Sequence, residues 1–530
     1  MLDILIKDIT IIDGTGEPRY QGNIGILEGK IILPSKIVEA RMVIEGSGYM
    51  IAPGFIDAHS HGDLILGDEC AKLCKTSQGV TTEIGGQCGL SAAPISEQYL
   101  NLAQAQLSVG ALSFPKEMKS WTSYKNYIEY EKSVDKTTNI VNYVGHSTLR
   151  IAVMGFDNRE PTFDEMEQMK NLLREAMEEG AIGLSTGLIY TPCCYATSEE
   201  IVELVKVIKP YNGIYATHMR NESYDVVNAV KEAINIGREA QVPVFISHHK
   251  VLGKSNWGLQ KQTLQLMEEA RKEGISITID QYPYTCCMTH LSACIPPWYF
   301  NEGVECMAEQ LKNPVIRQQI KREMLDEKSV YDNYYLNAGG FQGVLVSSAP
   351  HMPQVEGKTI QEYADELEQD AFDTFFDILI ENQGMASAVY SAMCEEDVFE
   401  IAQASHTVIG SDGLTRTLSE KGHPRAYATF PRAICYYHKE AGIMSLEEVI
   451  YRMTLLPAER LHLFNKGRIQ QGYDADLVIF DYNELKDMAT YLQPNTLAEG
   501  IEYVIVNGEI VYKKGKLTGV HSGKVIAYNH

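Results

Sequence analysis

The strongest constraint on the fold is a regular alternation of helical and strand-like segments in the middle of the chain. Thr162 and Glu165 form a capping box before a stripe of apolar residues at helical spacing, and Ala181–Thr186 follows as a strand. Further strands follow helical segments at Ile214–His218, Val242–His248 and Ile275–Gln281. Repeated units of this kind predict an α/β fold with a parallel sheet. A (β/α)8 TIM barrel fits best, and a doubly wound open sheet is the alternative.

Both ends of the chain are instead rich in short strands. Residues 1–52 read as strands separated by turns such as Asp13–Gly16, and Ala475–Phe480 and Tyr503–Val506 are strand-like near the other end. We therefore predict a small β-sandwich domain formed from both termini, 1–52 and 466–530, around a barrel at 53–465. The segment 288–337 is rich in proline, tyrosine and charge, and it is predicted to be a lid-like insertion near the barrel mouth.

The composition excludes several classes of partner. Of the 530 residues, 45% are hydrophobic and 22% are charged, which is typical of a globular protein that buries a large core. The formal charge of −24 argues against nucleic acid and against an acidic membrane surface. The N-terminus reads as a strand and not as a signal peptide. The 11 cysteines, an odd number, favour reduced thiols and a cytoplasmic location. The oligomeric state is left open.

A His-x-His pair follows the first predicted barrel strand, Met50–Ile56. Residues two apart in a strand share one face, so His59 and His61 can point into the same space, as two ligands of one ion must. By itself this pair is a weak signal for a metal site.

Ligand-type residues also stand where other predicted strands finish, at Cys88, His218, His248 and Asp412. Each has an ordinary explanation alone, since buried cysteines are usually core residues and Asp-Gly usually marks a turn. Together they occupy the end of a barrel where active sites lie. Sulfur, imidazole and carboxylate donors suit Zn²⁺, which keeps one position open for water. Asp412 is the candidate to move the proton of that water, because it ends the last predicted strand.

These positions lie within longer motifs that resemble a known family. Pro53–His61 resembles the opening signature of the amidohydrolase superfamily, and the whole chain is similar to the N-acyl-D-amino-acid deacylases, or D-aminoacylases. The motifs that carry the resemblance are 87–91, 183–190, 217–222, 247–250, 282–285, 410–413, 423–425 and 472–477.

The resemblance implies a role for each candidate residue. Cys88, His218 and His248 would hold a tightly bound zinc, and His59 and His61 would form a weaker second metal position. His248 is preferred to His249 because it falls at the family's spacing from His218, and its neighbour should face the other side of the strand. Asp412 would be the general base and acid. Cys88 takes the place of the carboxylated lysine that bridges two metals in many amidohydrolases, which points away from hydantoinases and dihydroorotases.

The free carboxylate of such a substrate needs cations and hydrogen-bond donors. The resemblance assigns this part to Lys250, Arg425, Tyr190 and Tyr282, with Tyr284 as the alternative to Tyr282. Relatives that act on acidic side chains use an arginine from the inserted region, and no arginine stands in 282–300. We therefore expect neutral or apolar side chains to be favoured. Arg416 is expected to be solvated, and the adjacent thiols 193–194 and 286–287 are expected to be compact loop residues.

The predicted activity is zinc-dependent hydrolysis of the amide bond of N-acyl-D-amino acids, which releases a D-amino acid and a carboxylate. The preference for the D-form comes from the resemblance alone. The alternatives are another amidohydrolase that acts on cyclic amides or dipeptides, and a non-catalytic scaffold. The scaffold is disfavoured because the chain keeps the full set of candidate ligands.

Overall fold

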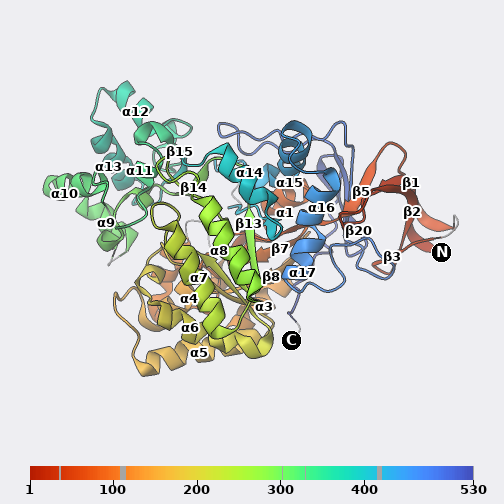
Figure 1. Ribbon diagram of the computed structural model, residues 1–530, viewed down its shortest axis with the longest axis horizontal. Helices are drawn as coiled ribbons and strands as arrows, with labels where there is room; N and C mark the ends of the chain where they lie inside the picture. Colours follow the sequence, from red (N-terminus) through yellow and green to blue (C-terminus); the bar gives the residue numbers. More distant parts are fainter. Residues whose placement is uncertain (35–37, 108–114, 301–302, 329, 415–420, 529–530) are drawn as a thin grey trace.

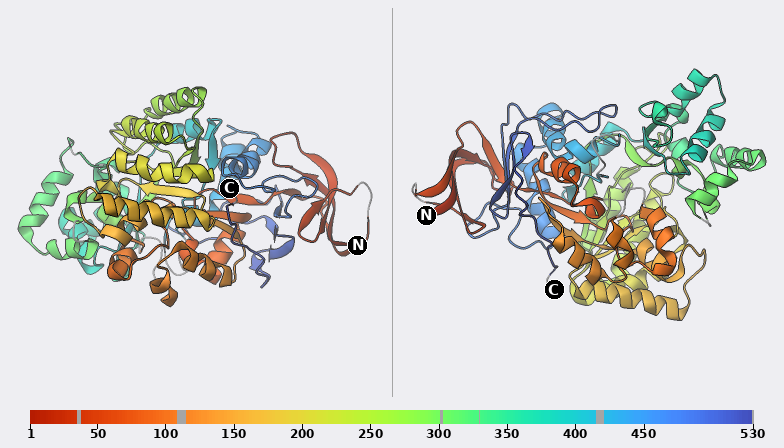
Figure 2. Two further views of the ribbon diagram at one scale, coloured as in Figure 1. Left: turned by 90° about the horizontal axis from the view of Figure 1, so that it is seen from below. Right: turned by 180° about the vertical axis from the view of Figure 1, so that it is seen from behind.

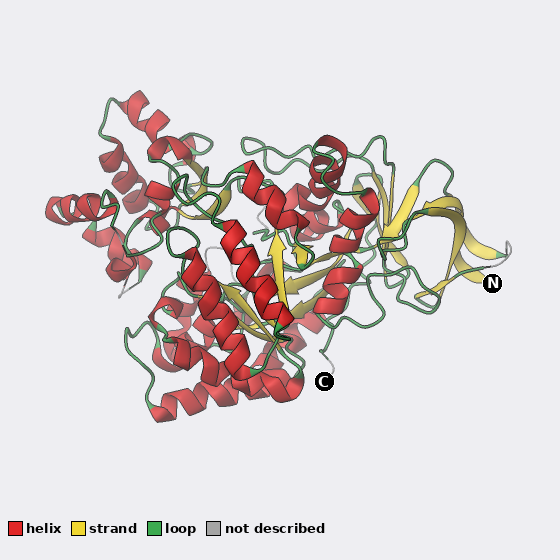
Figure 3. Cartoon of the chain, in the orientation of Figure 1, coloured by secondary structure: helices red, strands yellow, loops and turns green. Residues whose placement is uncertain are grey.

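Eight parallel strands form the centre of the molecule in a computed structural model that describes residues 1–34, 38–107, 115–300, 303–328, 330–414 and 421–528 (Figures 1 and 3). In order around the sheet they are β6 (Phe55–Asp57), β7 (Val80–Gly85), β8 (Asn139–Asn142) continued by β9 (Val144–Gly145), β10 (Gly183–Gly187), β11 (Ile214–His218), β12 (Val244–Ile246), β13 (Ile277–Gln281) and β17 (Thr407–Ile409). Ser60 pairs in parallel with Gly413, and Asp412 N donates to His59 O at 2.8 Å. These contacts join β17 to β6 and close the predicted barrel.

Amphipathic helices cover the outside of this barrel (Figure 3). They include α5 (Phe163–Glu178), α6 (Ser198–Ile208), α7 (Val226–Ala240) and α8 (Gln260–Lys272). The predicted capping box of α5 is confirmed, with Thr162 and Glu165 each bonded to the other's backbone. In the apolar stripe of α5, Leu173 and Met177 are fully buried, and each such side chain contributes roughly 1.5–3 kcal/mol. Among the residues described, none of the helices has the length and apolar character to cross a bilayer.

Strands from both ends of the chain join one nine-stranded sheet beside the barrel (Figure 2). They are β1 (Leu2–Ile11), β2 (Tyr20–Leu27), β3 (Lys30–Ile32), β4 (Ala40–Glu45), β5 (Met50–Pro53), β18 (Leu477–Phe480), β19 (Ile501–Val506), β20 (Glu509–Lys513) and β21 (Lys516–Leu517). This is the β domain that the sequence predicted from the two termini.

The predicted first barrel strand, Met50–Ile56, is wrong as one continuous strand. Its first part, β5, pairs with β1 and β18, and only β6 enters the barrel. The break falls at Gly54, where a Cβ atom would lie 2.2 Å from Thr81 Oγ1 and Cγ2. The close approach of these two segments therefore requires a glycine at the passage from one sheet to the other.

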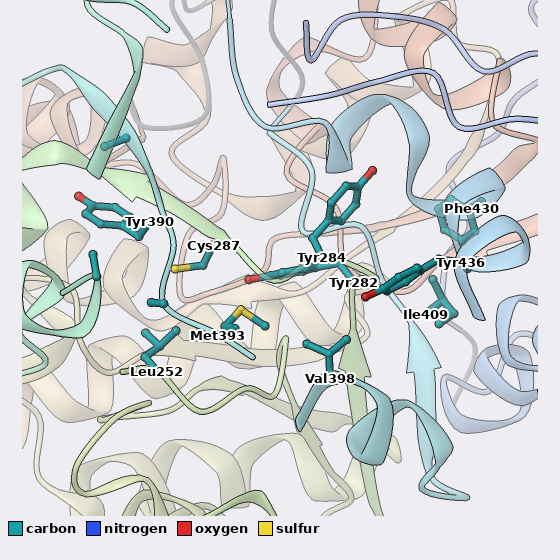
Figure 4. Close-up of a cluster of buried hydrophobic side chains, with 14 of the residues drawn as sticks. Leu252, Tyr282, Tyr284, Cys287, Tyr390, Met393, Val398, Ile409, Phe430 and Tyr436 are labelled. Carbon is teal, nitrogen blue, oxygen red and sulfur yellow. The ribbon is translucent and has the colours of Figure 1, made fainter. Parts of the chain in front are cut away.

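A separate group of elements follows β13. The antiparallel strands β14 (Cys287–His290), β15 (Val344–Ser348) and β16 (Ser387–Tyr390) form a small sheet. Helices α9 (Val304–Gln310), α10 (Pro314–Met324), α11 (Tyr334–Asn337), α12 (Ile360–Leu367) and α13 (Ala371–Glu381) lie around it (Figure 1). Buried side chains join this region to the barrel, among them Tyr282, Tyr284 and Cys287 with Tyr390 and Phe430 (Figure 4). The limits predicted for the insertion, 288–337, and for the other domains stay predictions.

Candidate metal centre and active site

Four of the predicted residues meet at the carboxyl ends of the barrel strands. The Sγ atom of Cys88 lies 3.3 Å from Nε2 of His59 and 3.3 Å from Nε2 of His248. One ligand atom from each of these residues and from Asp412 lies within 4.8 Å of the others, and all four residues are buried. The donor set of sulfur, imidazole and carboxylate is the one that binds zinc in proteins.

A second group of potential ligands shares His248 with the first. It contains His218 and Glu222, and its ligand atoms also lie within 4.8 Å of one another. Among the described residues, neither ring nitrogen of His218 has a hydrogen-bond partner, and Glu222 Oε2 has none either. Buried polar atoms are rarely left unpaired. The orphaned nitrogens of His218 therefore fit a site that is completed by a metal ion.

His61 lies beside this cluster and faces Asp412. Its Nε2 atom is 3.2 Å from Asp412 Oδ1, which is also 3.5 Å from His59 Nε2. The other ring nitrogen of His59 lies 3.1 Å from Asp280 Oδ2, on β13. A carboxylate on the far nitrogen fixes the orientation of a metal-binding histidine. The structure therefore brings together all five predicted ligands and Asp412.

Three of these residues adopt an unusual backbone conformation. The φ angles of Cys88, His248 and Asp412 are 55°, 37° and 47°, in the left-handed region that few non-glycine residues occupy. Each residue lies just beyond a barrel strand, where the chain turns its side chain inward. Such strain is concentrated at functional sites, where the surrounding structure imposes it.

The surroundings of Cys88, Asp412 and His218 favour the protonation states that bind metals. Burial raises the pKa of Cys88, but His59 and His248 outweigh this effect and hold the pKa well below that of an ordinary thiol. Burial likewise raises the pKa of Asp412, but Arg425 and the nearby histidines hold it well below its ordinary value. Burial lowers the pKa of His218 to about 4, so its ring is neutral at physiological pH. A thiolate, a carboxylate and a neutral imidazole are the forms that bind metals.

Arg425 and Lys250, the two cations predicted to bind the substrate carboxylate, have different surroundings. Arg425 begins α15 (Arg425–Arg432), and its Nη1 atom lies 2.8 Å from Asp412 Oδ2, with the guanidinium 4.7 Å from the centre of the Tyr282 ring. Lys250 Nζ is held by Glu222 Oε1 at 2.5 Å and by His248 O at 2.8 Å. Lys250 is therefore neutralised by the carboxylate of Glu222, which was not among the predicted site residues.

A cavity of about 60 Å³ opens on the cluster. The lining includes Tyr190, Tyr282, Lys250 and Arg425 but not Tyr284, so the structure brings Tyr282 into the site. Tyr190 packs on His218, with ring centres 5.0 Å apart, and its hydroxyl lies 3.4 Å from Thr289 Oγ1.

Two carboxylates of the site were missed from the sequence. Glu222 is the last residue of the 217–222 motif. Asp280 is the penultimate residue of the predicted strand Ile275–Gln281, so its position near a strand end was an available signal. His249 turns away from the cluster, with its Nε2 atom 2.8 Å from Thr263 Oγ1 on α8. Arg416 lies outside the described residues.

The adjacent thiols are packed among other side chains. Cys193 is fully buried and its Sγ atom lies 2.8 Å from Nδ1 of His146, whose Nε2 atom lies 2.8 Å from Glu200 Oε1. Cys287 lines the cavity on the metal cluster, whereas Cys286 packs with Met288 and Val389.

The chain is similar in sequence to known deacylases. The chain is 35% identical over 527 residues to the D-aminoacylase of Alcaligenes xylosoxydans xylosoxydans, covering 99% of this chain and 97% of that protein. It is 32% identical to the N-acyl-D-glutamate deacylase of the same organism, covering 96% and 94%.

Solved structures of deacylases are also similar to this chain. A crystal structure of a D-aminoacylase has a TM-score of 0.81 with 33% identity, covering 99% of each chain. The N-acyl-D-glutamate deacylase of Bordetella bronchiseptica, complexed with zinc and a phosphonate inhibitor, has a TM-score of 0.84 with 30% identity and the same coverage. Residues 43–512 match the amidohydrolase family. The chain therefore belongs to the amidohydrolase family and, within it, to the N-acyl-D-amino-acid deacylases.

Proposed function

We propose that the protein hydrolyses the linear amide bond of N-acyl-D-amino acids and releases a D-amino acid and a carboxylate. The convergence of Cys88, His59, His248 and Asp412, with ligand atoms within 4.8 Å of one another, is the observation that carries this proposal. The identity of 35% to a D-aminoacylase over 99% of the chain supports both the reaction and the choice of the D-form.

The proposed cofactor is zinc. Cys88, His218 and His248 would hold the tight site, and His59 and His61, with Cys88 as a bridge, would hold a weaker one. The ring nitrogens of His218, which have no hydrogen-bond partner among the described residues, support the first assignment. A study of a solved D-aminoacylase refers to a binuclear metal centre that one metal activates and a second attenuates. When bound, zinc polarises the amide carbonyl and lowers the pKa of a water molecule.

Asp412 is the proposed general base and acid. Its low pKa keeps the carboxylate ionised, so it is ready to accept a proton from the attacking water. As the C–N bond breaks, the same proton passes to the nitrogen of the leaving amino acid. The carboxylate is then free of the proton and ready for the next cycle.

Arg425 is the proposed anchor of the substrate carboxylate. A guanidinium can hold a carboxylate with two parallel hydrogen bonds, and Arg425 reaches the cavity from the first turn of α15. Tyr190 and Tyr282 are proposed to assist through their hydroxyl groups. Lys250 also lines the cavity, but its ammonium, held by Glu222 Oε1 and His248 O, acts as a point charge and cannot make the two-point contact of a guanidinium.

The preferred side chain of the substrate, the absence of nucleic-acid and membrane partners, and the cellular location are also proposals. Among the described lining of the cavity, Arg425 and Lys250 are the only arginine or lysine side chains, and both lie beside site carboxylates, which supports a preference for neutral or apolar side chains. The net charge of −24 supports the absence of nucleic-acid and membrane partners. The reduced thiols support a cytoplasmic location.

A substrate panel tests the proposal. Purified, zinc-loaded protein is given N-acetyl-D-amino acids, their L-forms, dipeptides and hydantoins, and release of free amine is measured. We expect turnover of the N-acetyl-D-amino acids. Turnover of hydantoins or L-forms alone would assign the chain to a different reaction.

A further inference from the structure

A buried group of charged side chains lies beside the end of β6, and the proposed reaction gives none of them a role. Lys75, on α1 (Glu69–Thr76), has its Nζ atom 2.6 Å from Asp57 Oδ2 and 3.5 Å from Glu83 Oε2. None of the three residues is more than 3% exposed. A buried salt bridge is often no more stabilising than a well-packed apolar group, so stability alone does not explain these charges.

Asp57 joins the ends of two barrel strands. Its Oδ1 atom accepts a hydrogen bond from Ser411 N at 2.8 Å, and its Oδ2 atom accepts one from Ser411 Oγ at 2.6 Å. Asp57 is the last residue of β6, whereas Ser411 follows β17. Among the described residues, the backbone pairing between these two strands consists of a single bridge, Ser60 with Gly413. The carboxylate of Asp57 therefore helps to hold together the two strands at which the barrel closes.

The residues on each side of Asp412 take part in these contacts. Ser411 precedes it, and Gly413, which follows it, donates its backbone N–H to Ser411 Oγ at 3.0 Å. Asp412 donates its own backbone N–H to His59 O at 2.8 Å, and its φ angle of 47° lies in the left-handed region. A non-glycine residue keeps such a conformation only where its surroundings impose it. The direction of the Asp412 carboxylate therefore depends on Ser411, and through Ser411 on Asp57.

Lys75 supplies the positive charge between two carboxylates. Burial lowers the pKa of Lys75, but Asp57 and Glu83 outweigh this effect and hold it above that of an ordinary lysine. The ammonium also donates to Ser411 Oγ at 3.3 Å, and Glu83 accepts a hydrogen bond from Ser60 Oγ at 2.8 Å. Without the ammonium, the two buried carboxylates would face each other with no counter-charge, which is a costly arrangement. Asp57 would then lose the partner that holds it against Ser411.

We propose that Lys75 is a positioning residue for the hydrolysis: through Asp57 and Ser411 it holds the carboxylate of the general base in place. Lys75 is not part of the described lining of the cavity on the metal cluster, so it acts through Asp412 and not on the substrate. This proposal rests on the proposed amidase function and adds a residue to its machinery.

Lys75→Met tests the role of the charge, because it removes the ammonium and nearly keeps the length of the side chain. We expect kcat for N-acetyl-D-amino acids to fall about tenfold or more, because a small displacement of a reacting group has a large effect on rate. The fall in kcat should exceed any rise in KM, and about one zinc per chain should be retained. A variant in which only KM changes overturns the proposal.

Lys466→Met is the matched control for stability. The Nζ atom of Lys466 is also buried between two carboxylates, 2.6 Å from Asp476 Oδ2 and 3.2 Å from Asp474 Oδ2, and it lies before β18, away from the metal cluster. Its loss should lower the melting temperature and leave kcat within about twofold of the unaltered protein. Equal falls of kcat in the two lysine variants would show a general effect of destabilisation and overturn the positioning role.

The effects of Lys75→Met and Asp412→Asn should not be additive. Once the carboxylate of Asp412 is replaced, no base is left to position, so adding Lys75→Met should lower kcat by less than about a further twofold. A further loss of about tenfold would show that Lys75 acts independently of Asp412, which contradicts the proposal.

Ser411→Ala is the second variant, for the case in which Lys75→Met does not fold. It removes the hydroxyl that donates to Asp57 Oδ2 and leaves the lysine in place, so kcat should fall about tenfold with zinc retained. An unchanged kcat in either folded variant refutes the positioning role while the amidase function stands. Absence of hydrolysis by the unaltered protein would instead overturn the proposed function, and the positioning role with it.

Discussion

Arg425 Nη1 lies 2.8 Å from Asp412 Oδ2, so the proposed anchor of the substrate carboxylate and the proposed general base form a buried ion pair. Both side chains are almost fully buried. The pair has two consequences, because Arg425 keeps Asp412 ionised and is itself held in place for the substrate. Binding and proton transfer are thus coupled through one contact.

Arg425→Lys should lower kcat/KM for N-acetyl-D-amino acids by about tenfold or more, because an ammonium cannot reproduce the two-point contact with a carboxylate. Substrate amides that lack the free carboxylate should be affected less. The control is Arg432→Lys, at the other end of α15, where the arginine pairs with Asp487. Equal losses for both kinds of substrate would remove Arg425 from the anchor role.

Asp412→Asn should retain the metal while kcat falls by about two orders of magnitude or more, because the amide cannot accept a proton from water. Metal content by elemental analysis and turnover under saturating substrate are the two measurements. Turnover close to that of the unaltered protein would refute the role of Asp412.

Cys88→Ala should lose most of the bound zinc, because the Sγ atom lies between two imidazoles at 3.3 Å from each. The unaltered protein should carry about one tightly bound zinc per chain. Cys435→Ala removes another buried thiol, whose Sγ contacts Leu485 O away from the cluster, and should keep its zinc. Full zinc content in the Cys88 variant would disprove the site.

Glu222→Gln should weaken zinc binding by about ten- to a hundredfold. Glu222 Oε1 lies 3.1 Å from Nδ1 of His248 and also holds Lys250 Nζ, which lies 2.7 Å from the same nitrogen, so Glu222 fixes the surroundings of this ring. Affinity is measured by competition with a chelator. Glu232→Gln, which disturbs contacts with Arg220 and Ser198, is the control and should bind zinc normally. Equal affinities in the two variants would argue against this orienting role.

Stability should fall as the pH rises from about 5 to 8, in part because of Glu131 on α3 (Tyr124–Ser133). Burial raises the pKa of this carboxyl from 4.5 to about 8, so the folded protein holds a proton that the unfolded chain has released. Within this window, Glu131 lowers the free energy of unfolding by up to about 1.4 kcal/mol for each pH unit.

Melting temperatures across this pH range test the effect. Glu131→Gln should show a smaller fall than the unaltered protein, because the amide does not titrate. Glu129→Gln, at an exposed position of the same helix, should behave like the unaltered protein. A steeper fall in the Glu131 variant would show that the sign is wrong.

Much of the architecture was predictable because it depends on local patterns. The spacing of apolar residues and the capping residues located helices and strands. The strand-rich ends of the chain predicted the β domain. The candidate ligands were also found from the sequence, since the carboxyl ends of parallel strands meet at one end of a barrel. Their proximity in the structure agrees with that reasoning, and their individual roles remain predictions.

The tertiary structure decided what depends on contacts between distant residues. The pairs Glu222 with Lys250 and His59 with Asp280 join positions 28 and 221 residues apart, and no local pattern encodes either distance. The break at Gly54 reflects the close approach of Thr81 from the next strand. A cavity of about 410 Å³ lies where the barrel and the region after β14 pack against each other, and no local pattern encodes it. The sequence thus determined the elements and the donor atoms, and packing determined which charges are neutralised and what space remains for the substrate.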